Sequence, residues 1–567
     1  MSLKKRIILF LLLITLLLSG CQSNVNTAFQ NFTRTLFKMD AASTTLGLHY
    51  TLEHPEDYGI YDSIITFGTF PSDPIAQKAV YENYRAVLNE FSYSSLSKEN
   101  QVTYDVLSSY INTAIQGSDY FLYEEPLSPI TGLHAQLPIL LSEYQFRTED
   151  DVQVYLDLLK TLPDYFHSLI QFEQQKSEAG LFMSDAIADE VIEQCQAFLA
   201  MEDENYLLSS FAQRLSQLPN LSSTKKNEYL AQNQAAIHSA VFPAYQELIQ
   251  ALTNLKGTAK TELGLSYLPD GKEYYAHLLK REIGTSRKPQ EVKTLLQAQI
   301  ADDFLHLQEL FQTALPSSNV ANVSFTETPD DVLSYLKQAT ANAFPYLRDV
   351  AVSVKYVPEN LAPYLSPAFY LIPAIDSTAE NVIYINPLHT LEEIPLFTTL
   401  AHEGYPGHLY QTSYYQQRNA DPLRHLLSFK GYVEGWATYA EMCSYSLLPL
   451  ESCHAQLLQR NSSLLLGLYA MADFGIHYEG WDLPRTTQFF SGYGIEDSAA
   501  IQEIYHLILG DPGNYLAYYL GYVEILELKR EMIEKEGVDF SQKEFHERFL
   551  NVGPAPFDIV RKYILGT

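Results

Sequence analysis

Two histidines and a glutamate lie within one seven-residue run, His402-Glu403-Gly404-Tyr405-Pro406-Gly407-His408. In zinc proteases with the pattern His-Glu-x-x-His, the two histidines share one helix face and bind the metal, and the glutamate acts as general base. Here the second histidine follows at six residues, which on a regular helix is about 120° around the axis from the first. The run can therefore bind a metal only if the helix is interrupted.

The residues between the two histidines are of the types that interrupt a helix. Pro406 has no N–H to donate, and its ring clashes with the carbonyl four residues earlier, at His402. Gly404 and Gly407 give the backbone the freedom to turn. We expect a short helix over residues 395–403, preceded by an edge strand over residues 381–386, an apolar β-branched and aromatic run.

A third metal ligand is expected downstream, on another helix. The run that ends in Glu441 begins Val433-Glu434-Gly435-Trp436, so it carries two carboxylates seven residues apart, on nearly the same helix face. Three protein ligands and one open position are typical of a catalytic zinc site, whereas four ligands indicate a structural one. Either Glu434 or Glu441 can complete such a site.

Together these motifs resemble the bacterial domain of unknown function 885 family, whose signature is His-Glu-x-x-Pro-Gly-His. That family is similar to zinc metallopeptidases of the gluzincin type, with a largely helical body around a deep cleft. The resemblance is specific from about residue 265 onward, and the N-terminal 200 residues carry no such motif. Further matching segments are 268–275, 434–441, 473–477 with 480–481, 512–521 and 545–546.

The resemblance implies a role for each residue of the candidate site. It implies His402, His408 and Glu434 as the ligands of Zn²⁺, with Glu441 as the alternative to Glu434. It implies Glu403 as the general base that takes a proton from the attacking water.

Two further residues are candidates for stabilising the oxyanion of the reaction, His477 and Tyr518. Both are equally compatible with a packing role. Asp473 either holds His477 or caps a helix. At several positions this chain has a residue other than the one usual in the family, so the side chains that face the substrate are expected to differ. These positions are Leu409, Tyr469, Asn514, Tyr515 and Tyr519.

The N-terminus has the pattern of a secretory signal peptide. Lys4, Lys5 and Arg6 precede an apolar run that ends in Leu18-Ser19-Gly20-Cys21, which resembles the lipobox of bacterial lipoproteins. Residues 1–20 are therefore predicted to be a signal peptide, and Cys21 to be lipidated. Acyl chains such as palmitate would tether the protein to the cell membrane on its extracytoplasmic side. An uncleaved membrane anchor is the alternative.

The remaining chain has the periodicity of helices, so we predict a mostly α fold, a large helical body with a small β-sheet beside the metal-binding helix. We expect the lipidated Cys21 and a linker with an amphipathic start at 21–45, an N-terminal helical region at 46–265 and a metallopeptidase catalytic region at 266–567. The long helical segments are 73–91, 150–177, 226–256, 289–315 and 516–536.

Charge and cysteine content narrow the function classes. With 37 Lys and Arg against 68 Asp and Glu, the net charge is −31. Such a surface repels phosphate backbones, which excludes nucleic-acid partners. Cys443 and Cys453 can either form a disulfide, if the helix between them breaks at Pro449, or remain free thiols like Cys195.

These observations predict a lipid-anchored, zinc-dependent peptidase that hydrolyses short or unfolded peptides. One alternative is an amidase that acts on cell-wall peptides or acylated amino acids by the same zinc chemistry. Another is a lipoprotein that binds peptides without hydrolysing them, which would have no need for Glu403 beside the metal ligands.

Overall fold

The computed structural model describes residues 25–314, 328–357, 362, 366–388 and 393–566. It is mostly helical with one small sheet, as the periodicity predicts. The predicted signal peptide and Cys21 lie outside the described residues. The helices of the first half are α2 (Val25–Ala41), α3 (Thr45–Thr51), α4 (Pro74–Leu88), α5 (Lys98–Gly117), α6 (Leu133–Glu143), α7 (Glu149–Leu159), α8 (Leu162–Ala179), α9 (Asp185–Ala200), α10 (Tyr206–Gln217), α11 (Ser223–Ala236) and α12 (Phe242–Leu255).

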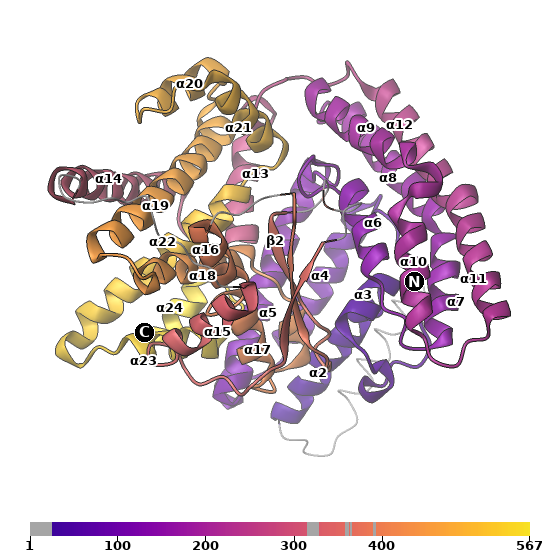
Figure 1. Ribbon diagram of the computed structural model, residues 1–567, viewed down its shortest axis with the longest axis horizontal. Helices are drawn as coiled ribbons and strands as arrows, with labels where there is room; N and C mark the ends of the chain where they lie inside the picture. Colours follow the sequence, from indigo (N-terminus) through magenta and orange to yellow (C-terminus); the bar gives the residue numbers. More distant parts are fainter. Residues whose placement is uncertain (1–24, 315–327, 358–361, 363–365, 389–392, 567) are drawn as a thin grey trace.

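The second half holds the candidate site. Its helices are α13 (Gly271–Leu278), α14 (Pro289–Ala314), α15 (Pro329–Thr340), α16 (Glu393–Glu403), α17 (His408–Gln416), α18 (Lys430–Ser444), α19 (Ser452–Phe474), α20 (Leu483–Ser491), α21 (Ser498–Gly510), α22 (Asn514–Glu536), α23 (Gln542–Val552) and α24 (Phe557–Leu565). In Figure 1 the magenta helices α7–α12 gather on the right and the orange and yellow helices α19–α24 on the left.

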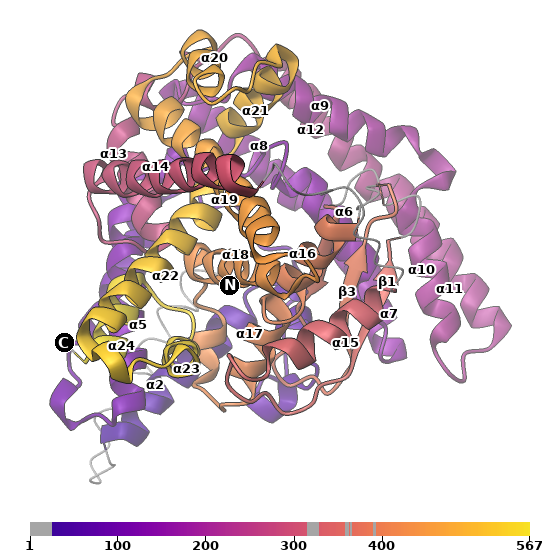
Figure 2. The same cartoon turned by 60° about the vertical axis from the view of Figure 1, so that its left-hand side comes forward.

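Buried side chains form two hydrophobic cores. The larger joins residues 29–123 to residues 265–565, and the smaller consists mainly of residues 127–252. The helices before residue 265 are thus shared between the two cores. Figure 2, which turns the left side of the molecule forward, shows α2, α5 and α24 close together although they come from opposite ends of the chain.

The long predicted helices are found, with two changes in detail. Segments 73–91, 289–315 and 516–536 correspond to α4, α14 and α22. Segment 226–256 forms α11 and α12, which a π-helical turn at Ile237–Val241 joins. Segment 150–177 divides into α7 and α8, because Pro163 at the start of α8 cannot donate to the carbonyl of Leu159.

The segment 21–45, predicted to be a linker followed by an amphipathic start, is helical for most of its length. Residues Val25–Ala41 form α2, an amphipathic helix whose Phe29 and Phe37 are fully buried in the larger core. The apolar face of this helix removes two phenyl rings from water, which stabilises its packed position by roughly 1.5–3 kcal/mol for each ring. From Val25 on, this segment is part of the folded body.

The sheet has three strands, β1 (Val352–Tyr356), β2 (Ala368–Leu371) and β3 (Asn381–Ile385), in the order β1-β3-β2. β3 pairs parallel to β1 and antiparallel to β2, with Tyr370 opposite Ile383. The strand predicted at 381–386 is therefore central, and β2 is the edge strand nearest the site helix. Side chains alternate along β3, so Ile383 packs in the larger core and Tyr384 against the smaller one.

The cysteines of the described residues are free thiols. Cys443 lies in α18 and Cys453 in α19, and the structure joins neither to the other or to Cys195. Of the two possibilities that the sequence leaves open for Cys443 and Cys453, the free thiols are observed. Within the described ranges, the helices are too short or too polar for any of them to span a bilayer.

Candidate metal centre

The helix that carries His402 stops at the predicted place. α16 ends at Glu403 and α17 begins at His408, with Gly407 as its N-terminal cap. The turn between them is closed by hydrogen bonds from the Gly407 N–H to the Ala401 carbonyl (3.0 Å) and from the Tyr410 N–H to the Gly404 carbonyl (3.2 Å). A Cβ at position 407 would collide with the carbonyl oxygen of His402, so the turn requires glycine there.

Helix α18 holds this turn from the other side. The indole Nε1–H of Trp436 donates to the Pro406 carbonyl oxygen at 2.9 Å, and the Trp436 side chain is fully buried. Trp436 is two residues after Glu434 on the same helix. The turn that brings the histidines together is thereby fixed relative to the helix that carries the predicted third ligand.

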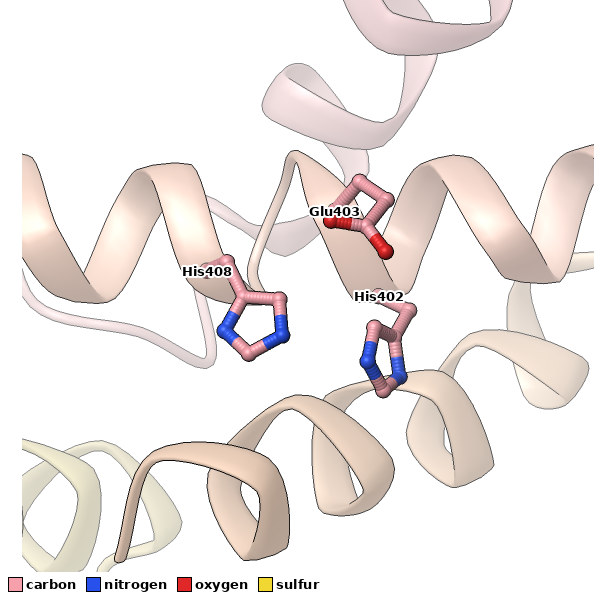
Figure 3. A group of neighbouring side chains, drawn as sticks. All are labelled: His402, Glu403 and His408. Carbon is pink, nitrogen blue, oxygen red and sulfur yellow. The ribbon is translucent and has the colours of Figure 1, made fainter. Parts of the chain in front are cut away.

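The two imidazoles and a carboxylate converge. Nε2 of His408 lies 3.4 Å from Oε2 of Glu434, and Nε2 of His402 lies 3.8 Å from the same oxygen. His402, Glu403 and His408 each offer a ligand atom within 4.8 Å of the others. Figure 3 shows His402 and Glu403 at the end of one helix and His408 at the start of the next, with their side chains directed toward one another.

These two distances are close to those expected between ligand atoms around one tetrahedral metal ion. Ligand atoms that are about 2.0–2.2 Å from a tetrahedral ion are separated from each other by roughly 3.3–3.6 Å. The two Nε2–Oε2 distances are close to this range. Two imidazoles and one carboxylate are also a donor set that zinc accepts in catalytic sites. Of the two carboxylates beside the histidines, Glu434 matches better than Glu403, because one of its oxygens faces both Nε2 atoms.

Glu441 occupies a different position around His402. Its Oε2 lies 3.1 Å from Nδ1 of His402, on the far side of the ring from Glu434. A carboxylate that accepts from the second nitrogen of a metal-binding histidine fixes the ring and its tautomer. A metal ion held by both Nε2 atoms would thus meet Glu434, whereas Glu441 would orient the His402 ring.

Glu403 is held by the edge of the sheet. The backbone N–H of Tyr370 in β2 donates to Oε2 of Glu403 at 2.9 Å. Because β2 is the edge strand, this N–H faces away from β3 and would otherwise lack a partner in the sheet. The bond fixes one carboxylate oxygen of Glu403.

Tyr518 lies beside the same group. Its ring stacks on the ring of His402, with centroids 6.2 Å apart and planes at 21°. Burial raises the pKa of Tyr518, and the carboxylates of Glu434 and Glu403 raise it further, so the phenol keeps its proton. The structure thus brings together five of the predicted catalytic and metal-binding residues.

The position of Tyr518 depends on how closely α18 and α22 cross. Gly435 of α18 and Gly521 of α22 bring the two backbones into contact, and a Cβ on either glycine would collide with the other helix. Gly435 follows Glu434 directly, and Gly521 lies three residues after Tyr518. This crossing sets the separation of the carboxylate from the phenol.

His477 lies outside this group. Its Nε2 is 2.8 Å from the Ile508 carbonyl oxygen, and its Nδ1 accepts from the N–H of Leu265 at 3.3 Å. Burial lowers its pKa to about 4, so the ring is neutral. With both nitrogens bound to backbone groups, His477 has the contacts of a structural residue and lies apart from the predicted catalytic group.

Asp473 does not hold His477 either. Its carboxyl group accepts from the hydroxyl of Tyr275 at 2.7 Å and from the N–H of Gly513, the residue that caps α22, at 2.9 Å. Asp473 lies inside α19, so it is not itself an N-cap residue, and its carboxyl group instead binds the backbone N–H of the residue that precedes α22. Asp473 therefore fixes the beginning of the helix that carries Tyr518.

The negative charges around His402 control its protonation. Burial lowers the pKa of His402, but its hydrogen bonds to Glu434 and Glu441 outweigh burial and hold this pKa well above the ordinary value. Burial raises the pKa of Glu434, but His402 and His408 outweigh it and lower this pKa well below the ordinary value. The imidazole of His402 and the carboxylate of Glu434 thus stabilise each other's charged forms.

Access to the site is partial. The side chains of His402, His408 and Glu434 retain 13%, 14% and 18% of their exposure, so all three reach solvent. Two cavities, of about 650 and 390 Å³, lie along α14 and away from these residues. The predicted deep cleft around the site stays a prediction.

The sequence did not indicate several residues that shape the site. The Tyr370 N–H could not be identified because its role depends on the strand order. The Trp436 contact with Pro406 and the Gly435–Gly521 crossing join segments that lie far apart in the sequence. A glycine beside Glu434 and another after Tyr518 were visible, but their contact became evident only in the folded chain.

Solved structures that share this fold include those of two bacterial proteins. A candidate lipoprotein from Colwellia psychrerythraea superposes with a TM-score of 0.83 at 19% identity, over 96% of this chain and 98% of that one. A candidate lipoprotein of unknown function from Shewanella oneidensis gives 0.66 at 17% identity, over 95% and 99%. No curated protein matches the chain. The family described as bacterial protein of unknown function (DUF885) matches residues 71–564, and the chain belongs to this family.

Proposed function

We propose that the protein is a zinc-dependent peptidase anchored to the membrane by lipid. The observation that carries the proposal is the approach of both Nε2 atoms, on His402 and His408, to a single oxygen of Glu434. A second carboxylate, on Glu403, lies beside them and is within 4.8 Å of both histidines. This pairing of three ligands with a free carboxylate is what hydrolysis by an activated water requires.

Each residue has a part in the proposed reaction. His402, His408 and Glu434 would hold the zinc, and Glu441 would keep the His402 ring in position. A zinc ion bound there would polarise the peptide carbonyl and make water a better nucleophile at neutral pH.

The protein then supplies the proton transfers. Glu403 would take the proton of the attacking water and return it to the leaving amine, with its other oxygen held by the Tyr370 N–H. The Tyr518 hydroxyl would donate to the substrate oxygen as negative charge develops there. A protonated phenol is required for this role, which agrees with its raised pKa.

Membrane attachment is a separate part of the proposal. The lipobox-like segment that ends in Cys21 supports a lipid anchor on the extracytoplasmic side. The two structural neighbours are also described as lipoproteins, and α2 begins only four residues after Cys21. An anchor at Cys21 would therefore hold the folded body close to the membrane surface.

Replacing Glu403 by Gln tests the catalytic proposal. The purified protein should hydrolyse a set of defined oligopeptides when loaded with zinc, and E403Q should lose about 10²–10⁴-fold in rate. Zinc content should stay at that of the parent, because the ligands are unchanged. The matched control is E496Q, at an exposed glutamate far along the chain, which should keep full activity. Unchanged hydrolysis by E403Q would refute the general-base assignment.

The same assay separates the alternatives. Hydrolysis of acylated amino acids or cell-wall peptides, with ordinary oligopeptides left intact, would indicate the amidase. Zinc-loaded protein that binds peptides and hydrolyses none of these substrates would indicate a binding lipoprotein.

A further inference from the structure

Lys430 lies one helical turn before Glu434, on the same face of α18. Its side chain is half-buried, and its Nζ donates to the side-chain oxygen of Asn514 at 2.9 Å. Asn514 is the first residue of α22, and Tyr518 follows it by one turn. The two helices therefore present matching pairs, Lys430 with Asn514 and Glu434 with Tyr518.

The close crossing of the helices keeps these pairs side by side. Gly435 and Gly521 allow backbone contact between α18 and α22 just beyond the second pair. Four residues of α-helix rise about 6 Å. The Lys430 backbone is thus about 6 Å along α18 from that of Glu434, and the ammonium reaches out from there.

The charge of Lys430 is not used by an ion pair. The chain has 68 acidic residues against 37 basic ones, yet among the described residues no carboxylate lies within 4 Å of the Lys430 ammonium. Asp511 and Asp473 are near enough for the Lys430 charge to lower their pKa values, but both are hydrogen-bonded to other groups. Asp511 accepts from the Thr131 hydroxyl at 3.1 Å, and Asp473 accepts from Tyr275 and Gly513. The ammonium keeps N–H donors for an additional acceptor.

The residues around the Lys430 ammonium are partly exposed to solvent, as are the residues of the candidate metal site. Lys430, Asn514, Tyr515 and Tyr518 are all half-buried, whereas Leu516 and Ala517 on the opposite side of the helix are fully buried. A row of partly exposed polar side chains thus runs from the histidines to Lys430. A peptide that lies along this row would place its end near the ammonium.

We propose that Lys430 binds the C-terminal carboxylate of the substrate, so that the protein removes residues from the C-terminal end of peptides. This inference rests on the proposed function. Each residue of an extended peptide spans about 3.3–3.6 Å. The backbones of Lys430 and Glu434 are about 6 Å apart along α18, which is the span of one to two residues of an extended peptide beyond the cleaved bond.

Asn514 has a positioning role in this subsite. Its amide oxygen holds the Lys430 Nζ at 2.9 Å without neutralising it, which a carboxylate at the same position would do. Lysine on a flexible stem needs such a contact to keep its charge in one place. Asp511 and the other nearby acidic residues would repel a substrate carboxylate at any position away from the ammonium. This repulsion would restrict the substrate carboxylate to the position beside Lys430.

The test compares two peptides of one sequence, one with a free C-terminal carboxylate and one with a C-terminal amide. Zinc-loaded wild-type protein should hydrolyse the free acid with a kcat/KM at least tenfold higher than the amide. K430M should lose this advantage through a raised KM for the acid. K430R should restore part of the preference. The control K160M removes an exposed lysine that pairs with Asp157 on the surface, and should change nothing.

A binding measurement makes the result independent of turnover. In the E403Q background, calorimetry should show tighter binding of the acid than of the amide, and K430M should remove the difference. Equal binding of both peptides by E403Q, or an unaltered acid preference in K430M, would overturn the inference. If wild-type protein hydrolyses neither peptide, the proposed function fails, and the binding comparison still decides the role of Lys430.

Discussion

Nδ1 of His402 lies 3.1 Å from Oε2 of Glu441, while Nε2 of the same ring faces Glu434. The two carboxylates of α18 are seven residues apart and so share one side of the helix, yet they contact different nitrogens of the same imidazole. The seven-residue spacing of Glu434 and Glu441 therefore lets both carboxylates act on His402, rather than making one an alternative to the other. Glu441 fixes the ring that Glu434 and the metal would share.

E441Q should weaken zinc binding without abolishing it. Gln can keep a hydrogen bond to Nδ1 but lacks the charge that makes the imidazole a stronger donor, and loss of such a partner typically costs 10–100-fold in metal affinity. Competition with a chromogenic chelator measures the change. E496Q, at an exposed position, is the control and should match the parent. A complete loss of zinc from E441Q would instead make Glu441 a direct ligand.

H408A should lose stoichiometric zinc. His408 supplies one of two imidazoles, and its removal leaves His402 and Glu434, which are too few protein ligands to hold zinc tightly. Metal analysis of the purified protein after dialysis gives the stoichiometry. H54A removes a histidine that is 59% exposed and should leave the zinc content at one per chain. Unchanged zinc in H408A would refute the role of the six-residue spacing.

The sequence predicted the interrupted helix because the residue types in the turn allow little else. Pro406 and Gly407 end α16 where expected, and a side chain at 407 would collide with His402. The role of Glu441 remained open because both carboxylates lie on one helix face, and only the position of His402 between them separates their roles.

The strand order could not be read from local sequence. β3 has the composition of a strand, but its central place depends on β1 and β2, which pair with it from either side. The division into two cores could not be predicted from the sequence either, because α2 and α5 pack against helices that follow several hundred residues later. Periodicity identifies an apolar face and leaves its partner undetermined.

G435A should destabilise the protein and impair catalysis. Glycine to alanine within a helix ordinarily stabilises by about 0.5–1 kcal/mol, but here the added Cβ would collide with the Gly521 backbone. Overpacking of this kind typically costs about 1–3 kcal/mol in the free energy of unfolding. Urea denaturation measures the loss, and hydrolysis by the folded variant reports the shift of Tyr518 relative to Glu434.

The matched control for this variant is G492A. Gly492 has right-handed helical angles, and a Cβ there would meet its nearest neighbour, the Phe489 carbonyl oxygen, at 3.2 Å. Its stability should stay within about 1 kcal/mol of the parent. A stability of G435A equal to that of G492A would show that the two helices can separate without cost.

The stability contributed by Asp473 should depend on pH. Burial raises the pKa of Asp473 from 3.8 to about 8, although Tyr275 and Gly513 donate to it. The folded protein thus retains a proton that the unfolded chain releases above pH 4. The contribution of this group is fully present below about pH 4 and is lost as the pH rises toward 8, by up to about 1.4 kcal/mol per pH unit.

D473N separates this effect from the other titrating groups. The amide oxygen can still accept from Tyr275 and Gly513, but the side chain cannot ionise. Urea midpoints of parent and D473N between pH 5 and 8 should therefore converge or cross, with the parent losing stability relative to the variant as the pH rises. A constant difference across this range would mean that Asp473 has the same charge in the folded and unfolded chains. In that case the carboxylate is ionised at the start of α22, where the N–H groups of the first turn favour a negative charge.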